Sequence, residues 1–408
     1  MKARRFLVIW HRWFGLLAAV WLLILAITGS VIVWSDEIDG WLNPDLRHVA
    51  ATGDRLPVQV LVDRLEAANP GYHVDYLMRP REATDSVLAF VAPNGPAPAD
   101  YVFRQTYLDP YSGQILGQRI FGEAGLDRRR VMQFLYQLHM DLSLGPWGYW
   151  FFGLVALLWM IDHFVSIMLS FPKAKNWQRS FTARWRAGGF RLTFDLHRAG
   201  GLWLLPVTFT LALTGWALTW NGEFRTVVGQ FSPISAFPIE DVPPKPQPIF
   251  RPALDVDRAI AIAESRPGAG AVNAISWHPD KHIWWLRSFD PRDLDDLGRR
   301  WTVVDYTTGQ VLAERHQAEG SSGDLFNAWM FPLHSGEAFG LAGRIIISLS
   351  GVVLSIIIVT GLMIWARKRK ANRRKNLWSD GSGPTADPTQ GRHSPSIATR
   401  VPLVPSDT

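Results

Sequence analysis

The apolar stretch VIWHRWFGLLAAVWLLILAITGSVIVW (8–34) decides the architecture of this chain of 408 residues. It exceeds the roughly 20 apolar residues that a membrane-spanning helix needs. Lys2, Arg4 and Arg5 precede it like the start of a signal peptide, but the apolar run is too long for one and no convincing small-residue cleavage site follows. We therefore expect a retained membrane helix.

Three further apolar runs, at about 147–171, 198–220 and 341–365, are long enough to cross a bilayer. The amino terminus, the loop 172–191 and the stretch 366–375 are rich in Lys and Arg, which favours a cytoplasmic position for all three. The sequence therefore predicts an integral membrane protein with both termini in the cytoplasm. This topology accounts for the net charge of +6 without a nucleic-acid partner.

The apolar runs divide the chain into eight predicted segments. The four helices are helix 1 with a short cytoplasmic start (1–34), helix 2 (141–171), helix 3 (197–220) and helix 4 (336–366). Two outer domains (35–140 and 221–335), a basic cytoplasmic loop (172–196) and a basic, disordered cytoplasmic tail (367–408) make up the rest.

The first and third helices share a sequence pattern. WHRWFGLL (10–17) and DLHRAGGL (195–202) each contain a His-Arg pair, and in each helix a Thr-Gly pair follows that His by seventeen residues, from His11 to Thr28 and from His197 to Thr214. The second and fourth helices also begin alike, because His139 is followed by glycines at 145 and 148 and His334 by glycines at 340 and 343. These matches predict two internal repeats.

The two outer segments repeat as well. Each contains a helix candidate, at 56–71 and 253–268, followed by strand-like runs. The stretches TYLDPYSGQILGQRI (106–120) and TVVDYTTGQVLAER (302–315) both place an Asp and a Ser/Thr-Gly turn between apolar runs, which predicts β-hairpins. We therefore expect a four-helix transmembrane bundle built from two repeats, with two small α+β outer domains.

Four histidines recur at the ends of these helices. An ionisable side chain in or beside a bilayer is costly and indicates function. His11 and His197 lie near the cytoplasmic ends, and His139 and His334 lie near the outer ends. Facing imidazoles in a helical bundle can serve as axial ligands of haem iron, so we predict two haem b groups. The absence of cysteine excludes thiolate-held clusters and covalent haem attachment.

Two points stay open at this level. The histidines could instead be headgroup contacts or helix-end hydrogen bonders, and the glycines could serve plain helix packing. His163 has no repeat counterpart, since Ile358 takes that position, and it stays open as an added ligand at the inner site. Two haems near opposite faces would carry electrons across the membrane. No nucleotide-binding fingerprint is present, so the electrons must come from quinol or a partner protein.

The motifs HRWFGL and DLHRAGGL, each followed by TG, together with LHMDLSLGPWG and PLHSGEAFGLAGR, resemble the PepSY-associated transmembrane helix family over about residues 5–370. The hairpins YLDPYSGQILG and VVDYTTGQVLA resemble PepSY domains. The second helix departs from the family pattern, because it has DHFVSIMLSFP where the fourth has TGLMIW.

This resemblance implies an iron-regulated protein of the bacterial inner membrane with periplasmic PepSY domains, similar to siderophore reductases. It implies haem b held by His11, His139, His197 and His334, ferric siderophore as substrate, and no catalytic acid or base. The main alternative is a non-enzymatic regulator or scaffold whose PepSY domains bind a periplasmic protein or peptide. A transporter is a third hypothesis, which four helices without a broken charged helix make weaker.

Overall fold

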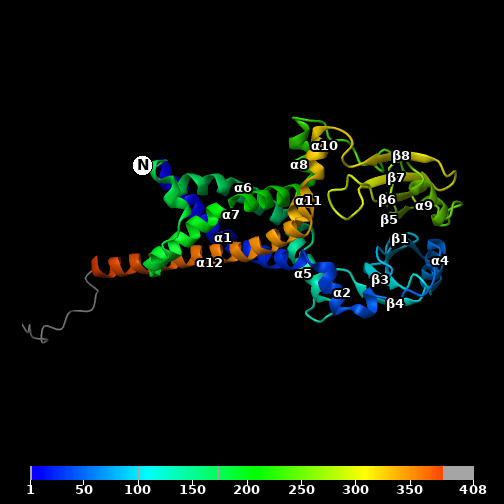
Figure 1. Ribbon diagram of the computed structural model, residues 1–408, viewed down its shortest axis with the longest axis horizontal. Coiled ribbons are helices and arrows are strands. Elements are labelled where there is room, and N and C mark those ends of the chain that lie inside the picture. Colours follow the sequence, from blue (N-terminus) through cyan, green and yellow to red (C-terminus); the bar gives the residue numbers. More distant parts are fainter. Residues whose placement is uncertain (1, 100, 172–173, 380–408) are drawn as a thin grey trace, which may run out of the picture. The chain divides into compact units, whose positions relative to one another are not determined.

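The computed structural model describes residues 2–99, 101–171 and 174–379. The chain divides into two compact units, Met1–Leu362 and Met363–Thr408. The first unit contains a helical bundle and a β-sheet (Figure 1).

In the described part of the chain, four helices are long and apolar enough to cross a membrane. They are α1 (Lys2–Ile32), α6 (Pro146–Ser170), α7 (Gly189–Thr219) and α12 (Gly340–Ser379). Large apolar side chains on their surfaces are exposed, including Leu17, Trp203 and Leu349. An apolar surface of this kind suits a lipid environment, because lipid tails impose no cost on it.

Two helix boundaries differ from those expected. Helix α7 begins at Gly189, within the loop predicted at 172–196, and the short 3₁₀ turns η1 (Ala174–Phe181) and η2 (Trp185–Ala187) precede it. Helix α12 continues to Ser379, into the predicted disordered tail, because residues 366–375 are almost all good helix formers. The rest of that tail lies outside the described residues.

The segments that carry His139 and His334 form short helices of their own. These are α5 (Val131–Asp141), which precedes α6, and α11 (Met330–Ser335), which precedes η3 (Glu337–Phe339) and α12. The remaining short helices connect the bundle to the sheet: α2 (Ser35–Leu42), α3 (Pro44–Arg47), α8 (Asn221–Gly229) and α10 (Ser322–Ala328).

The strands of the two predicted outer domains join in one eight-stranded sheet. Its antiparallel strand order is β4-β3-β2-β1-β5-β6-β7-β8, so that β1 and β5 join the two halves. The strands are β1 (Tyr72–Met78), β2 (Val87–Pro93), β3 (Arg104–Leu108), β4 (Ile115–Ile120), β5 (Val272–His278), β6 (Ile283–Ser288), β7 (Arg300–Asp305) and β8 (Val311–His316). Both predicted hairpins form, as β3–β4 and β7–β8.

Helices α4 (Val58–Ala68) and α9 (Val256–Glu264) cover this sheet and share one core with it. Each buries apolar residues at the spacing i, i+3, i+4 and i+7, which makes one face of a helix. The two helices also cap each other. Asp257 accepts hydrogen bonds from the backbone N–H groups of Val58 and Gln59 at 2.9 and 2.8 Å, and the Gln59 side chain accepts one from Val256. The two halves therefore fold as one body.

This joined sheet can be tested by cross-linking, because the chain has no native cysteine. Tyr76 of β1 lies opposite Ser276 of β5. Opposed residues in an antiparallel pair have Cα atoms about 4.5–5.5 Å apart, within the range of a disulfide. The double variant Tyr76→Cys/Ser276→Cys should cross-link under mild oxidation, measured as a mobility shift on non-reducing gels. Tyr76→Cys/Ala274→Cys, one diagonal step away, is the control that should not, and equal behaviour of the two would contradict the pairing.

Candidate functional site

The four repeated histidines form two facing pairs inside the bundle. His11 of α1 faces His197 of α7, with ring centroids 6.1 Å apart and ring planes inclined by 58°. His139 of α5 faces His334 of α11, with centroids 6.2 Å apart and planes inclined by 60°. We call these the distal pair (His11 and His197) and the sheet-side pair (His139 and His334). The structure thus supplies the pairing that the sequence left open.

The spacing within both pairs suits a metal ion between the rings. An imidazole nitrogen binds a first-row metal such as zinc at about 2.0–2.1 Å, which puts the centres of two opposed imidazole rings roughly 6 Å apart. The two pairs lie far from each other along the bundle. His11 and the Thr28 that contacts His139 are separated by seventeen residues of α1, which is roughly 25 Å of helix.

Hydrogen bonds fix the orientation of the sheet-side rings. Nδ1 of His139 lies 3.0 Å from Oγ1 of Thr28, and Nδ1 of His334 lies 2.8 Å from Oγ1 of Thr214. Each threonine already donates its one hydroxyl hydrogen to the carbonyl four residues earlier, at 2.7 Å in both helices. A hydroxyl has a single donor hydrogen, so both threonines accept from the imidazole. Nδ1 therefore carries the hydrogen and Nε2 keeps a free lone pair.

The distal rings are held in the same way by different acceptors. Nδ1 of His11 lies 2.8 Å from Oδ2 of Asp162, and Nδ1 of His197 lies 2.9 Å from the backbone oxygen of Ile357 and 3.4 Å from Oγ1 of Thr360. Within the ranges that the structure describes, no protein group hydrogen-bonds Nε2 of any of these four histidines. A ring fixed through one nitrogen and free at the other is typical of a metal-ligating histidine.

The Thr-Gly pairs pack directly against the rings. A Cβ atom on Gly29 would lie 2.9 Å from Cε1 of His139, and one on Gly361 would lie 2.9 Å from Cε1 of His197. Gly215 is near His334, with a corresponding distance of 3.8 Å. The threonine of each pair thus orients the imidazole, and the glycine leaves room for it.

Two further glycines turn α5 and α11 back into the bundle. Gly145 and Gly340 each lie six residues after the histidine and have φ of 61° and 55°, a conformation that side chains disfavour. Gly148 and Gly343, nine residues after it, contact backbone so closely that a Cβ atom would overlap it. The glycine spacing in the sequence is therefore explained by this bend.

His163 differs from the paired histidines. Its Nδ1 bonds the backbone oxygen of Trp159 at 2.7 Å, and its Nε2 bonds Oγ1 of Thr208 at 2.9 Å. Both ring nitrogens are thus engaged by the protein, which argues against its use as an added ligand. The neighbouring Asp162, which sequence reasoning missed, is the residue that supports the distal pair. A carboxylate within an apolar helix was the available signal.

A cavity of about 1410 Å³ opens beside the sheet-side pair. Its bundle end is lined by His139, His334, Gly29 and Gly215, and it extends to charged side chains of the sheet and of the segments next to it. Those charged groups include Arg79, Arg119, Arg287, Asp293, Asp295, Glu337 and Arg344. Burial lowers the pKa of His139 to about 3, with a contribution from His334, and lowers the pKa of His334 to about 4. Both imidazoles are therefore neutral at pH 7, the form that binds metal.

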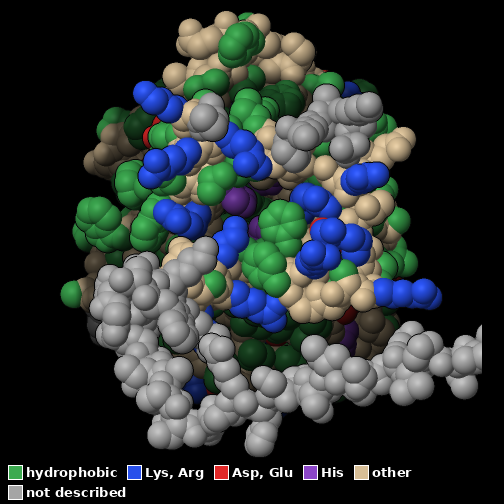
Figure 2. All heavy atoms as spheres, turned by 90° about the vertical axis from the view of Figure 1, so that its left-hand side faces the viewer, with side chains coloured by type: hydrophobic (Ala, Val, Ile, Leu, Met, Phe, Trp, Pro, Cys, Tyr) green, Lys and Arg blue, Asp and Glu red, His purple; other side chains and the backbone are tan. Residues whose placement is uncertain are grey.

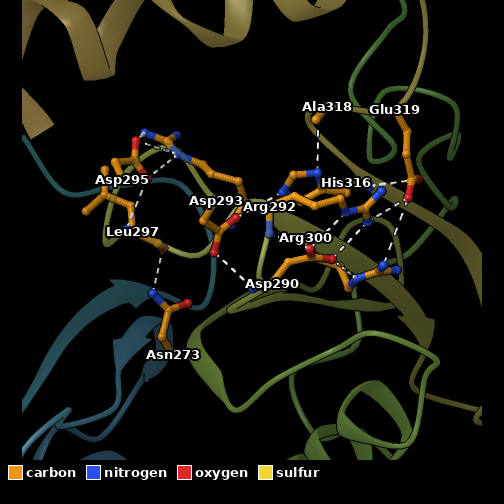
Figure 3. Close-up of polar contacts among 11 residues, drawn as sticks. Asn273, Asp290, Arg292, Asp293, Asp295, Leu297, Arg300, His316, Ala318 and Glu319 are labelled. Carbon is orange, nitrogen blue, oxygen red and sulfur yellow. Dashed lines mark hydrogen bonds and ion pairs between the residues drawn. The ribbon is translucent and has the colours of Figure 1, made fainter. Parts of the chain in front are cut away.

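One wall of this cavity is the loop between β6 and β7, which an ionic network holds in place (Figure 3). Asp290 is buried and accepts hydrogen bonds from Arg292 and Arg300, both at 2.9 Å. The guanidinium of Arg292, and to a smaller extent that of Arg300, holds the pKa of Asp290 well below its usual range. Asn273 of β5 donates to the backbone oxygen of Leu297 at 2.6 Å and ties the loop to the sheet.

Basic side chains gather at the opposite end of the bundle. Figure 2 shows Lys and Arg side chains around this end, with a His side chain visible between them. Exposed members of this group include Arg4, Arg5, Arg12, Arg184 and Arg191. The distal pair lies near this end, since His11 and Arg12 are adjacent and Arg191 is at the start of α7.

No group of three or more His, Cys, Asp or Glu side chains that could hold a metal ion occurs among the described residues. Four apolar helices with two facing histidine pairs define an integral membrane protein with two candidate cofactor sites.

Comparison with protein families places the chain more closely. The family model described as the PepSY-associated TM region matches residues 8–368. The chain belongs to this family, as its motifs predicted, and it is a membrane protein. A search of curated proteins gave no match.

The bend after α5 provides a test of the site's construction. Gly148→Ala should disrupt the packing of α5 against α6, because the added methyl overlaps the backbone oxygen of Asp141. Overpacking of this kind costs about 1–3 kcal/mol, so the Tm in detergent should fall clearly. Gly15→Ala is the matched control, since a Cβ there meets nothing within 4 Å. Equal Tm values for both variants would contradict the bend.

Proposed function

We propose that this protein is a haem-b-containing electron-transfer protein of the bacterial inner membrane that reduces ferric siderophore in the periplasm for iron release. The observation that carries the proposal is the pair of facing histidines at each end of the bundle, with ring centroids 6.1 and 6.2 Å apart. Among the described residues, no protein group hydrogen-bonds any of the four Nε2 atoms. Two pairs at opposite ends suit transfer across a membrane, whereas a scaffold has no need of them.

The residues around both pairs fit haem. His11 with His197 and His139 with His334 would be the axial ligands, held through Nδ1 by groups of neighbouring helices. The glycines beside the rings leave room for the imidazoles, and the cavity at the sheet-side pair offers space for a flat macrocycle. When bound, haem iron supplies one-electron redox chemistry. The protein contributes ligands, orientation and electrostatics.

The basic end of the bundle supports a cytoplasmic position for the distal pair, by the positive-inside rule. The sheet and the sheet-side pair would then lie on the periplasmic side. Electrons would enter from quinol or a partner protein near the distal pair. We also propose that the chain consists of two repeats, and that the two halves of the sheet are PepSY units, since each half has a helix followed by four antiparallel strands.

The part of the cavity that extends from the sheet-side pair to the charged side chains is the proposed substrate site. The volume of the whole cavity, about 1410 Å³, exceeds the usual 300–1,000 Å³ of a small-molecule pocket. One electron converts the Fe(III) of the siderophore to Fe(II), which a chelate of hard oxygen ligands holds less tightly. No proton transfer is needed, so we assign no catalytic acid or base.

Histidine variants test the two sites. His139→Ala and His334→Ala should each lose one of two haems and keep the other, because the pairs are far apart along the bundle. His11→Ala and His197→Ala should lose the other one. His163→Ala is the matched control and should keep both, since its nitrogens bond Trp159 and Thr208. The measurement is haem per chain by pyridine haemochrome assay. Unchanged haem in all four ligand variants would disprove the assignment.

Activity is tested by mixing the chemically reduced protein with ferric siderophores and following haem oxidation and Fe(II) capture. Wild-type protein should be reoxidised by at least one siderophore, while His334→Ala should be reoxidised much more slowly. If the reduced haem is not reoxidised by any ferric siderophore, the proposed electron-transfer sites stand but the proposed substrate is wrong. Absence of haem would favour the alternative of a PepSY-mediated binding protein.

A further inference from the structure

The two histidine pairs differ in the groups that accept their Nδ1–H bonds. Both acceptors of the sheet-side pair are neutral threonine hydroxyls. In the distal pair His197 donates to the neutral backbone oxygen of Ile357, but His11 donates to the carboxylate of Asp162. Asp162 lies 23 residues after His139, as Ile357 does after His334. The equivalent position in the two halves of the chain therefore supplies the acceptor for the distal histidine, as a charged carboxylate in one half and as a neutral backbone oxygen in the other.

The charge of Asp162 is directed at His11. The Asp162 side chain is 8 % exposed, and its second oxygen, Oδ1, has no hydrogen-bond partner. Among the ion pairs of the described residues, none joins Asp162 to a Lys or Arg. Asp195, the other buried carboxylate near the distal pair, is instead paired with Arg184 and Arg198. Among the described residues, the ion pair with His11 is the one that Asp162 makes.

In a metal-bound imidazole, one nitrogen binds the metal and the other can donate a hydrogen bond. A carboxylate that accepts this bond makes the imidazole a more basic ligand and favours the more positive oxidation state of the metal. The effect grows as the effective dielectric constant falls, and at this site the Asp162 side chain is buried whereas His11 is 33 % exposed. A hydroxyl or a backbone oxygen polarises the ring less, because neither carries a full charge. The pair supported by a carboxylate should therefore prefer the oxidised state more than the pair supported by threonines.

We propose that Asp162 is a positioning residue that, through His11, lowers the reduction potential of the distal site below that of the sheet-side site. This inference rests on the proposed function and adds the direction of transfer to it. Each transfer moves one electron from the reduced distal site to the oxidised sheet-side site, with no bond formed or broken. The donor restores the first site and the ferric substrate reoxidises the second, so the order of potentials favours flow toward the sheet.

The test is a redox titration of haem absorbance in Asp162→Asn, which keeps an oxygen that accepts from His11 but removes the charge. The background variant His139→Ala isolates the distal site for the same measurement. Mutation of a group that supports a metal ligand typically costs 10–100-fold in metal affinity or activity. We expect the oxidised-to-reduced ratio of the distal site to fall about tenfold at a fixed potential, a rise of about 59 mV for one electron. The sheet-side potential should not change.

Two further variants complete the design. Asp162→Glu keeps the charge and should keep the low distal potential. This variant still tests the inference if Asp162→Asn loses haem. Thr28→Val is the matched control at His139 and should leave the distal potential unchanged. An unchanged distal potential in Asp162→Asn, or a raised one in Asp162→Glu with full haem content, would overturn the inference while the proposed function stands. Wild-type protein without haem would instead overturn the proposed function itself.

Discussion

The hydrogen bond that holds Nδ1 of each paired histidine is the interaction on which the site depends. It selects the tautomer with a free Nε2 and fixes the orientation of the ring. In three of the four cases a Thr-Gly pair stands beside the histidine, so that the threonine or a nearby backbone oxygen accepts the bond and the glycine leaves room for the ring. The same two-residue motif thus serves different helices.

The bend that precedes α6 and α12 follows from this requirement. His139 and His334 lie on short helices outside the long spans, and they reach α1 and α7 because glycines with positive φ reverse the chain. The long helices alone would not bring four histidines into two pairs. The sheet forms a single body in turn, because α4 and α9 cap each other and share one core. The cavity lies between this body and the sheet-side pair.

Much of this organisation could be predicted from the sequence, because it depends on local pattern. Hydropathy located the four long helices, and the Asp and Ser/Thr-Gly turns located both hairpins. The single sheet could not be predicted, since the pairing of β1 with β5 joins segments about 200 residues apart and leaves no local signal. A carboxylate within an apolar helix marks Asp162 as unusual, but its partner could not be predicted, because His11 lies 151 positions away.

The central claim is that two haem sites lie in one four-helix bundle, and its most direct test is the amount of haem in the purified wild-type chain. The measurement is a reduced-minus-oxidised visible spectrum with pyridine haemochrome quantification. The account predicts a b-type spectrum and about two haems per chain, as two bis-histidine sites require. A haem-free chain, purified from cells supplied with iron and haem precursor, would contradict the account.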